Sequence, residues 1–314
     1  MCSFPTSPAR SLSTLSGGGL PFYFLHTLTN AATVSYAVHG IVKNCKNHYS
    51  TSDSIARSIP YFGIMLVGIG SAVFHSTNLY YTQWADDLSM LFATATVLHR
   101  VYTFDKTPKE TIIWGGALAA FLVAFSVYHC WADEVVFHGL IFAVMIIIVG
   151  TKTRAIIAKT VTDPFVMAEV RKLVWYGTGS FALGYAFWNV DFHGCGHHSS
   201  DGDTGLTALK RWIGMPLSFL FELHGWWHIF TGIGAYIFIA LVEYLTSEEA
   251  GETLGGRFAW PVEAICLKSE KRSRKLSSGE NRVTGKSING SKNVVATGKE
   301  GNGEALLSQR MKLT

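Results

Sequence analysis

Charge is scarce in this sequence: Asp, Glu, Lys and Arg together make up only 15% of its 314 residues, and no acidic residue occurs before Asp53. The five cysteines (positions 2, 45, 130, 195 and 266) show no spacing typical of a metal site. No repeat of about 20 to 50 residues indicates a solenoid. These absences argue against a water-soluble domain, a thiolate metal site and a repeat protein.

Apolar sequence is abundant instead, at 48% of residues, and it comes in long blocks. A membrane-spanning helix needs about 20 predominantly apolar residues. Seven blocks approach or exceed that length: 22–43, 60–79, 84–104, 110–131, 134–151, 173–192 and 214–245. The sequence therefore predicts an all-α polytopic membrane protein whose seven transmembrane helices occupy residues 22–245.

The two ends of the chain have a different composition. Residues 1–21 are Ser-rich and contain one Arg and no acid, which is typical of a leader without a fold of its own. Residues 246–314 are rich in Ser, Gly, Lys and Asn. Because this segment has little to bury, we predict a basic, disordered tail.

The charges between the apolar blocks predict the orientation. Basic residues gather in the segments 43–57 and 152–172 and in the tail, whereas the short turn "WADE" is acidic. Since Lys and Arg favour the cytosolic side, we expect a cytosolic C-terminus and a lumenal N-terminus. Only Cys2 and Cys195 then lie on the oxidising side, where they could form a disulfide. The net charge of +4 is explained by the cytosolic loops and indicates no nucleic-acid partner.

Polar residues within the predicted spans are the main functional signal, because an ionisable residue there costs about 2.5 to 3.5 kcal/mol on insertion scales. Six polar residues lie at the outer ends of three spans: Ser71 and His75 in 60–79, Asp86 and Asp87 in 84–104, and His224 and His228 in 214–245. Residues four apart share one face of a helix. The sequence thus predicts a single polar site at one depth, near the outer surface of the membrane.

The residue types at that depth suggest a metal. Three neutral imidazoles from His75, His224 and His228 suit zinc and leave a fourth position open, which is the catalytic form of a zinc site. Zinc lowers the pKa of bound water from 15.7 to about 7, so a nucleophile is available at neutral pH. We therefore predict a catalytic zinc ion.

Other polar residues fit supporting roles by position. Asp86 can transfer the proton of the attacking water, and Ser71, one turn before His75, can donate a hydrogen bond to a developing oxyanion. Asp87 lies about 100° around the helix from Asp86, so only one of the two can face the metal. Glu222 is a candidate for fixing the tautomer of a histidine.

Simpler interpretations apply to the other histidines. A lone histidine in a membrane helix usually forms a hydrogen bond to a neighbouring helix, and this interpretation is given to His26, His39, His99, His129 and His138. The spacing H-x-x-x-H alone is weak, since haem-binding membrane cytochromes also use paired histidines. The segment "WNVDFHGCGHHSSDGD" has four possible ligands (His193, Cys195, His197 and His198) but is rich in Gly and Ser, so we predict an exposed loop.

Two long motifs, "GSAVFHSTNLYYTQWADDLSML" and "ELHGWWHIFTGIGAY", closely resemble the alkaline ceramidases, particularly the fungal ones, and the likeness runs from about residue 27 to 245. The resemblance implies a seven-helix zinc hydrolase of the endoplasmic reticulum or Golgi. Such an enzyme cleaves the amide bond of ceramide, a membrane lipid, to a sphingoid base and a fatty acid. Carried over by position, the zinc ligands are His75, His224 and His228, with Asp86 as acid/base and Ser71 as the hydroxyl beside the metal.

The N-terminus departs from the family pattern. Ceramidases have an acidic stretch before the first helix that binds calcium, and calcium needs oxygen ligands. Because no acid precedes Asp53, we expect no calcium site, and the family's lumenal disulfide keeps an N-terminal partner only if Cys2 supplies it. An inactive paralogue is one alternative function. A seven-helix receptor of the adiponectin-receptor-like type, which has a similar residue set, is another, although "ELHGWWHIFTG" favours the ceramidases.

Overall fold

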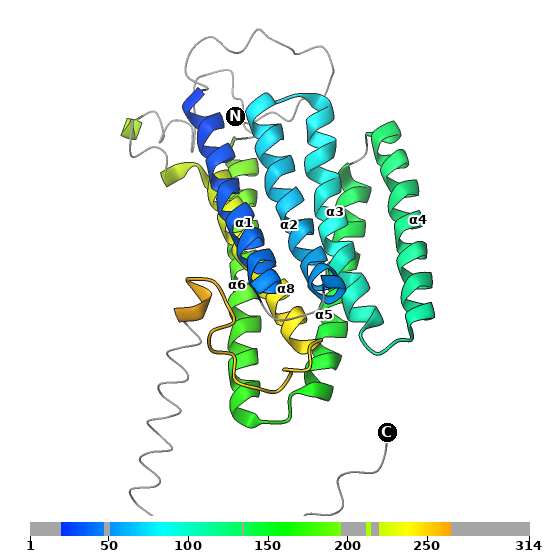
Figure 1. The fold of residues 1–314 in the computed structure, drawn as a ribbon. Helices are drawn as coiled ribbons and strands as arrows, with labels where there is room; N and C mark the ends of the chain where they lie inside the picture. Colours follow the sequence, from blue (N-terminus) through cyan, green and yellow to red (C-terminus); the bar gives the residue numbers. More distant parts are fainter. Residues whose placement is uncertain (1–19, 47–50, 134, 196–211, 215–219, 265–314) are drawn as a thin grey trace, which may run out of the picture. The chain divides into compact units, whose positions relative to one another are not determined.

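The computed structural model describes residues 20–46, 51–133, 135–195, 212–214 and 220–264 (Figure 1). This part of the chain forms long helices and contains no strand, so the all-α prediction is confirmed for it. The helices are α1 (Leu20–Lys46), α2 (Thr51–Thr77), α3 (Tyr80–Thr103), α4 (Pro108–Ala132), α5 (Val135–Thr160), α6 (Pro164–Cys195) and α8 (Leu223–Leu245). Each predicted span overlaps one of them.

Four of these helices are long and apolar enough to cross a membrane: residues 53–77, 108–132, 136–160 and 223–245. The chain is therefore an integral membrane protein with several spans. Helices α1, α3 and α6 have 27, 24 and 32 residues, which at about 1.5 Å per residue is enough to cross a bilayer core of about 30 Å. Since they do not reach the same apolar character, the number of seven spans stays a prediction.

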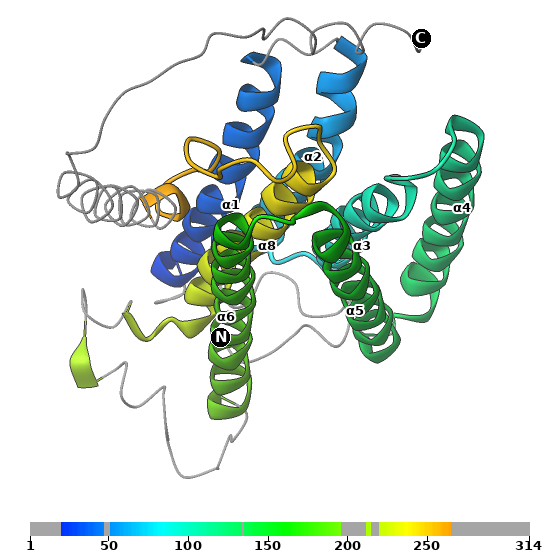
Figure 2. The ribbon, with the colours of Figure 1, turned by 90° about the horizontal axis from the view of Figure 1, so that it is seen from below.

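Helix α8 is the centre of the bundle. It contacts α1, α2, α3, α5 and α6, and Figure 2 shows it surrounded by other helices. Two glycines permit this close packing: a Cβ atom at Gly232 would lie 2.4 Å from Thr33 Oγ1, and one at Gly234 would lie 2.7 Å from Phe181 Cδ2. Small residues allow helix backbones to approach in this way within membranes. Helix α4, by contrast, lies at the edge and packs mainly on α3.

The beginning of the predicted tail proves to be folded. Residues 246–264 pack on the bundle, where Leu254 and Val262 are fully buried. The backbone N–H of Ala259 donates to the hydroxyl of Tyr236 at 2.6 Å. The prediction of disorder from residue 246 onward is therefore wrong for this stretch, because its average composition hides a few apolar residues that bury well. Residues 20 and 21 of the predicted leader begin α1. Residues 1–19 (which include Cys2), the tail beyond residue 264, His197 and His198 lie outside the described residues.

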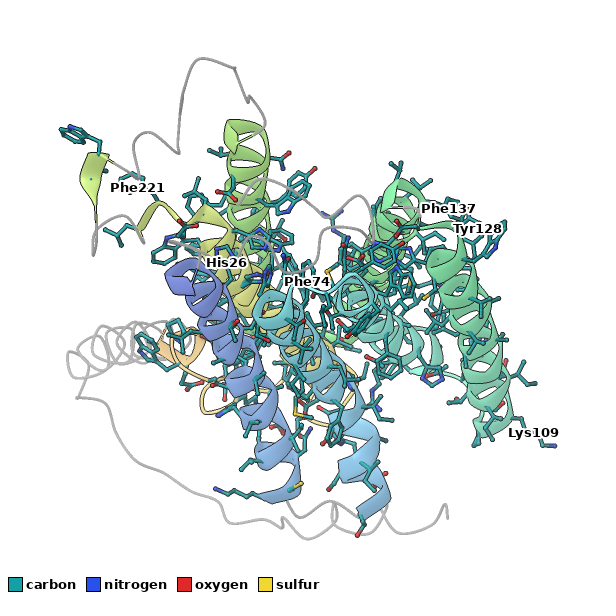
Figure 3. The ribbon with its side chains drawn as sticks, turned by 90° about the horizontal axis from the view of Figure 1, so that it is seen from above. His26, Phe74, Lys109, Tyr128, Phe137 and Phe221 are labelled. Carbon is teal, nitrogen blue, oxygen red and sulfur yellow. The ribbon has the colours of Figure 1, made fainter. Side chains whose placement is uncertain are left out.

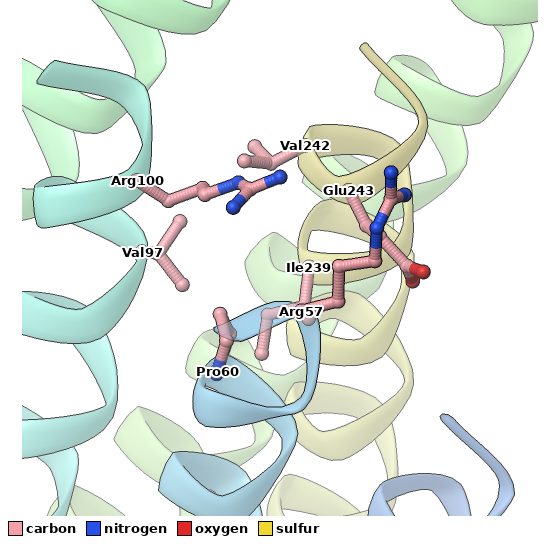
Figure 4. A pocket seen from close by; sticks show the side chains of 7 residues that line it. All are labelled: Arg57, Pro60, Val97, Arg100, Ile239, Val242 and Glu243. Carbon is pink, nitrogen blue, oxygen red and sulfur yellow. The ribbon is translucent and has the colours of Figure 1, made fainter. Parts of the chain in front are cut away.

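A polar network joins the helices at the end of the bundle that we predict to be cytosolic. The Tyr61 hydroxyl donates to Glu243 Oε2 at 2.6 Å, and Lys43 Nζ lies 3.5 Å from the same oxygen. Beside it, a cavity of about 10 Å³ is lined by residues that include Arg57, Arg100 and Glu243 (Figure 4). This volume holds about one water molecule at most. The network therefore ties α1, α2 and α8 together but offers no room for a substrate.

Candidate metal and catalytic site

Three histidines predicted from the sequence meet at the opposite end of the bundle. His75 lies in the last turn of α2, and His224 and His228 lie in the first two turns of α8. The Nε2 atom of His75 is 3.3 Å from that of His224 and 3.1 Å from that of His228. The rings of His224 and His228 are 4.8 Å apart between centroids. The three imidazoles thus direct nitrogen atoms toward one small region.

These distances suit a tetrahedral metal. A zinc ion at about 2.0 to 2.1 Å from each nitrogen requires nitrogens about 3.3 Å apart. Two of the three separations in the triad, at 3.1 and 3.3 Å, agree with this requirement. The donor set is entirely imidazole, which suits zinc and other transition metals better than calcium or magnesium.

A fourth histidine, His26 of α1, joins the cluster. His26, His75 and His224 each offer a ligand atom within 4.8 Å of the others. His228 approaches the same His75 nitrogen at 3.1 Å, so it competes with His26 for the place of third ligand. The set with His228 has the shorter distances, whereas His26 Nε2 lies 3.5 Å from Glu222 Oε2. We therefore favour His228 as the third ligand and His26 as a neighbour that Glu222 orients. Figure 3 shows His26 near the end of α2 that carries Phe74.

The sequence predicts only a helix-to-helix contact for His26. A signal was present, because His26 lies near the outer end of the first predicted span, at the depth of the other site residues. What sequence could not show is that α1 packs directly against α2 and α8. Glu222 also has a partner that the sequence does not indicate. Its carboxylate contacts His26 of α1, although the candidate ligands His224 and His228 are much closer to it in sequence.

Ser71 and Asp86 form a hydrogen-bonded chain beside the histidines. Ser71 is buried, and its side chain is hydrogen-bonded to the carboxyl group of Asp86. Asn30 Nδ2 donates to Ser71 Oγ at 3.1 Å and to the carbonyl oxygen of His26 at 3.0 Å. The chain from Asn30 through Ser71 to Asp86 therefore crosses α1, α2 and α3. Because Asn30 donates to the Ser71 oxygen, the hydroxyl hydrogen is left to point toward Asp86.

Asp87 faces away from this chain, toward α4 and α5. Its Oδ2 lies 3.6 Å from His129 Nε2, and its backbone carbonyl oxygen lies 3.0 Å from His138 Nε2. The adjacent aspartates therefore contact different helices, as their angular separation on α3 requires. His99 forms the predicted link between helices, since its Nε2 lies 3.1 Å from the carbonyl oxygen of Thr111. His39 packs edge-on against Tyr236 of α8, which is a ring contact and not the predicted hydrogen bond.

Comparison with known proteins agrees with the fold and the motifs. Residues 23–268 match the sequence profile of the Ceramidase family, which is more than half of the chain. The chain therefore belongs to the ceramidase family, a family of membrane-embedded enzymes.

Two relatives are similar over most of their length. Alkaline ceramidase YPC1 of Saccharomyces cerevisiae is 27% identical over 247 residues, which cover 75% of each chain. Alkaline ceramidase 3 of Mus musculus is 23% identical over 223 residues, which cover 70% of this chain and 76% of the relative. The resemblance noted in the motifs thus extends over the whole helical part of the chain.

Proposed function

We propose that this protein is a zinc-dependent ceramidase with seven transmembrane helices, which hydrolyses the amide bond of ceramide to a sphingoid base and a free fatty acid. The observation that carries the proposal is the convergence of His75, His224 and His228 next to the hydrogen-bonded pair of Ser71 and Asp86. Membership of the ceramidase family and the names of the two relatives support ceramide as the substrate. The endoplasmic reticulum or Golgi, with a lumenal N-terminus, is part of the same proposal.

The three histidines would hold the zinc ion in this scheme. Zinc held there supplies a nucleophile at neutral pH, because it lowers the pKa of water to about 7. Asp86 accepts a proton from the attacking water and delivers it to the amide nitrogen, so that the carbon–nitrogen bond breaks and the amine leaves. The products are a fatty acid and a sphingoid base, and the atoms of one water molecule are divided between them.

Ser71 stabilises the carbonyl oxygen of the substrate as negative charge develops on it. In the resting arrangement its hydroxyl is bonded to Asp86. Once Asp86 has taken up a proton it is a poorer acceptor, so the Ser71 hydrogen becomes available to the carbonyl oxygen. Asn30 holds Ser71 in position throughout, through its 3.1 Å hydrogen bond to Oγ.

The position of the site suits a lipid. His75 and His224 lie at the ends of helices α2 and α8, so the reacting groups lie near one surface of the bilayer, where the amide of a ceramide is also found. A substrate that diffuses within the membrane can reach such a site sideways between helices. The cavity beside Glu243 at the other end of the bundle is far too small to hold it.

Purified full-length protein tests the proposal. With zinc bound at about one ion per chain, we expect it to release sphingoid base and fatty acid from ceramide in equal amounts, as measured by mass spectrometry. Protein that carries one zinc ion and binds ceramide but releases neither product would instead support the receptor alternative. Loss of both zinc and turnover in the same preparation would point to the inactive paralogue.

A further inference from the structure

A groove runs along the outside of the bundle between α1 and α2. Its volume is about 420 Å³, within the range of about 300 to 1,000 Å³ for ligand-binding clefts. Small and apolar side chains form most of its walls: Ala31, Val34, Ile69, Ala72 and Val73. The groove is open to the surroundings, because Ile69 is 45% and Val73 is 41% exposed. On a membrane helix that surface faces lipid.

The groove begins at the catalytic site. Asn30 lines it and donates the hydrogen bond that holds Ser71. Thr27 and Ser76 line the same end, and they directly follow His26 and His75 in sequence. The polar end of the groove therefore adjoins the reacting groups, whereas the remainder is largely apolar.

The groove also has a defined inner end. It extends on α1 from Thr27 to Ser35 and on α2 from Ser76 back to Gly68, which is eight residues, or about 12 Å, on each helix. At Gly68 the helices come together: a Cβ atom there would lie 2.7 Å from Val34 Cγ2 and 3.2 Å from the carbonyl oxygen of Asn30. The groove thus leads from the site toward the middle of the membrane and closes at a helix-helix contact.

The hydrogen-bonded chain indicates which part of the substrate lies there. Asp86 comes from α3 and must reach the amide nitrogen, which carries the sphingoid base. Ser71 must reach the carbonyl oxygen. The acyl chain leaves the carbonyl carbon on the side opposite the nitrogen. Asn30 of α1 and Asp86 of α3 contact Ser71 from different helices, so a substrate whose nitrogen faces Asp86 would extend its acyl chain toward α1.

We propose that the α1–α2 groove binds the N-acyl chain of the substrate and limits its length, while the sphingoid base lies on the α3 side. This inference rests on the proposed ceramidase function. It makes Ala31, Ala72 and Val73 specificity-determining residues, since enlarging them fills the groove without touching the histidines.

The test compares Ala72→Leu and Ala31→Leu with Ala120→Leu, an exposed change of the same size on α4, remote from the groove. Each protein is given two series of ceramides. In the first, the N-acyl chain increases in length and the sphingoid base is fixed; in the second, the sphingoid base increases in length and the N-acyl chain is fixed. For the groove variants we expect kcat/KM to fall at least tenfold for long acyl chains relative to short ones. We expect no such dependence on the length of the base, and the Ala120→Leu protein should match the unmodified one.

A cross-linking experiment gives a readout that does not depend on turnover. A ceramide with a photoreactive group in its acyl chain should label peptides from α1 and α2, and Ala72→Leu should reduce the labelling several-fold. Labelling from a photoreactive sphingoid base instead, or equal loss of turnover for all chain lengths, overturns the groove assignment. If the zinc-loaded unmodified protein hydrolyses no ceramide at all, the proposed function is wrong. If it hydrolyses ceramide normally but the groove variants do not change its preference for acyl-chain length, only the assignment of the groove is wrong.

Discussion

Helix α3 lies between two clusters of histidines, and the clusters differ in what their nitrogens contact. On the Asp86 side, the Nε2 atoms of His224 and His228 lie 3.3 and 3.1 Å from that of His75. On the Asp87 side, His138 Nε2 lies 3.0 Å from a backbone carbonyl oxygen and His129 Nε2 lies 3.6 Å from the Asp87 carboxylate. Both clusters contain a carboxylate, and both are shielded by the bundle.

This difference separates the candidate metal site beside Asp86 from the histidines beside Asp87, which link helices. A nitrogen that donates to a carbonyl oxygen carries a hydrogen and has no lone pair for a metal, so His138 cannot ligate through Nε2. The Nε2 atoms of His224 and His228 instead face that of His75 at about the separation that tetrahedral zinc requires. In this protein the direction of the ring nitrogens, rather than residue type, distinguishes the candidate metal site from the histidines that link helices.

Removing ligands should have the largest effect. We expect the double change His224→Ala and His228→Ala to reduce zinc from about one ion per chain to near zero and ceramide hydrolysis to background, because only one favoured ligand is left. The matched control is His129→Ala with His138→Ala, which should keep the zinc. Stoichiometric zinc in the His224/His228 variant, or loss of zinc from the His129/His138 variant, would show that the metal site is not the one assigned here.

Asp86→Asn should have the next largest effect on turnover. Loss of a general acid/base lowers the rate by about 10² to 10⁴-fold. Because Asn keeps the size of the side chain and can still contact Ser71, zinc content and thermal stability should stay near those of the unmodified protein. Single-turnover hydrolysis together with metal analysis checks both statements, and activity within tenfold of normal would remove Asp86 from its proposed role.

Asp87→Asn should act on stability more than on chemistry. The change leaves His129 without its charged partner at 3.6 Å, and a buried group that loses its partner costs about 1 to 3 kcal/mol. We expect a lower Tm with a substantial fraction of the activity retained. An activity loss equal to that of Asp86→Asn would show that the two aspartates act as one unit.

Calcium should have the smallest effect. The carboxylates near the histidine site already have partners, since Asp86 bonds Ser71, Asp87 pairs with His129 and Glu222 pairs with His26. Calcium prefers six to eight oxygen ligands. We therefore expect millimolar calcium to change hydrolysis by less than about twofold. A strong activation, titrated at fixed zinc, would reveal oxygen ligands that the sequence does not indicate.

Much of the site could be predicted because helical spacing is a local property. Four-residue separations place Ser71 with His75 and His224 with His228, and the adjacency of the two aspartates forces them apart by about 100°. The choice between Asp86 and Asp87 rested on a motif, since α3 could have been rotated either way. In the structure Asp86 contacts Ser71 and Asp87 faces His129, and the catalytic role of Asp86 stays a prediction.

The sequence by itself determined that the chain is helical and membrane-embedded, because apolar blocks of that length have no other stable arrangement in lipid. It also determined the depth of the polar residues, because depth follows from position along each helix. Only the tertiary structure decided which polar residues meet. His26 and Asn30 join the site, and the α1–α2 groove reaches it, because α1 packs against α2 and α8. Packing between helices depends on the shapes of whole helix surfaces, which no local sequence pattern records.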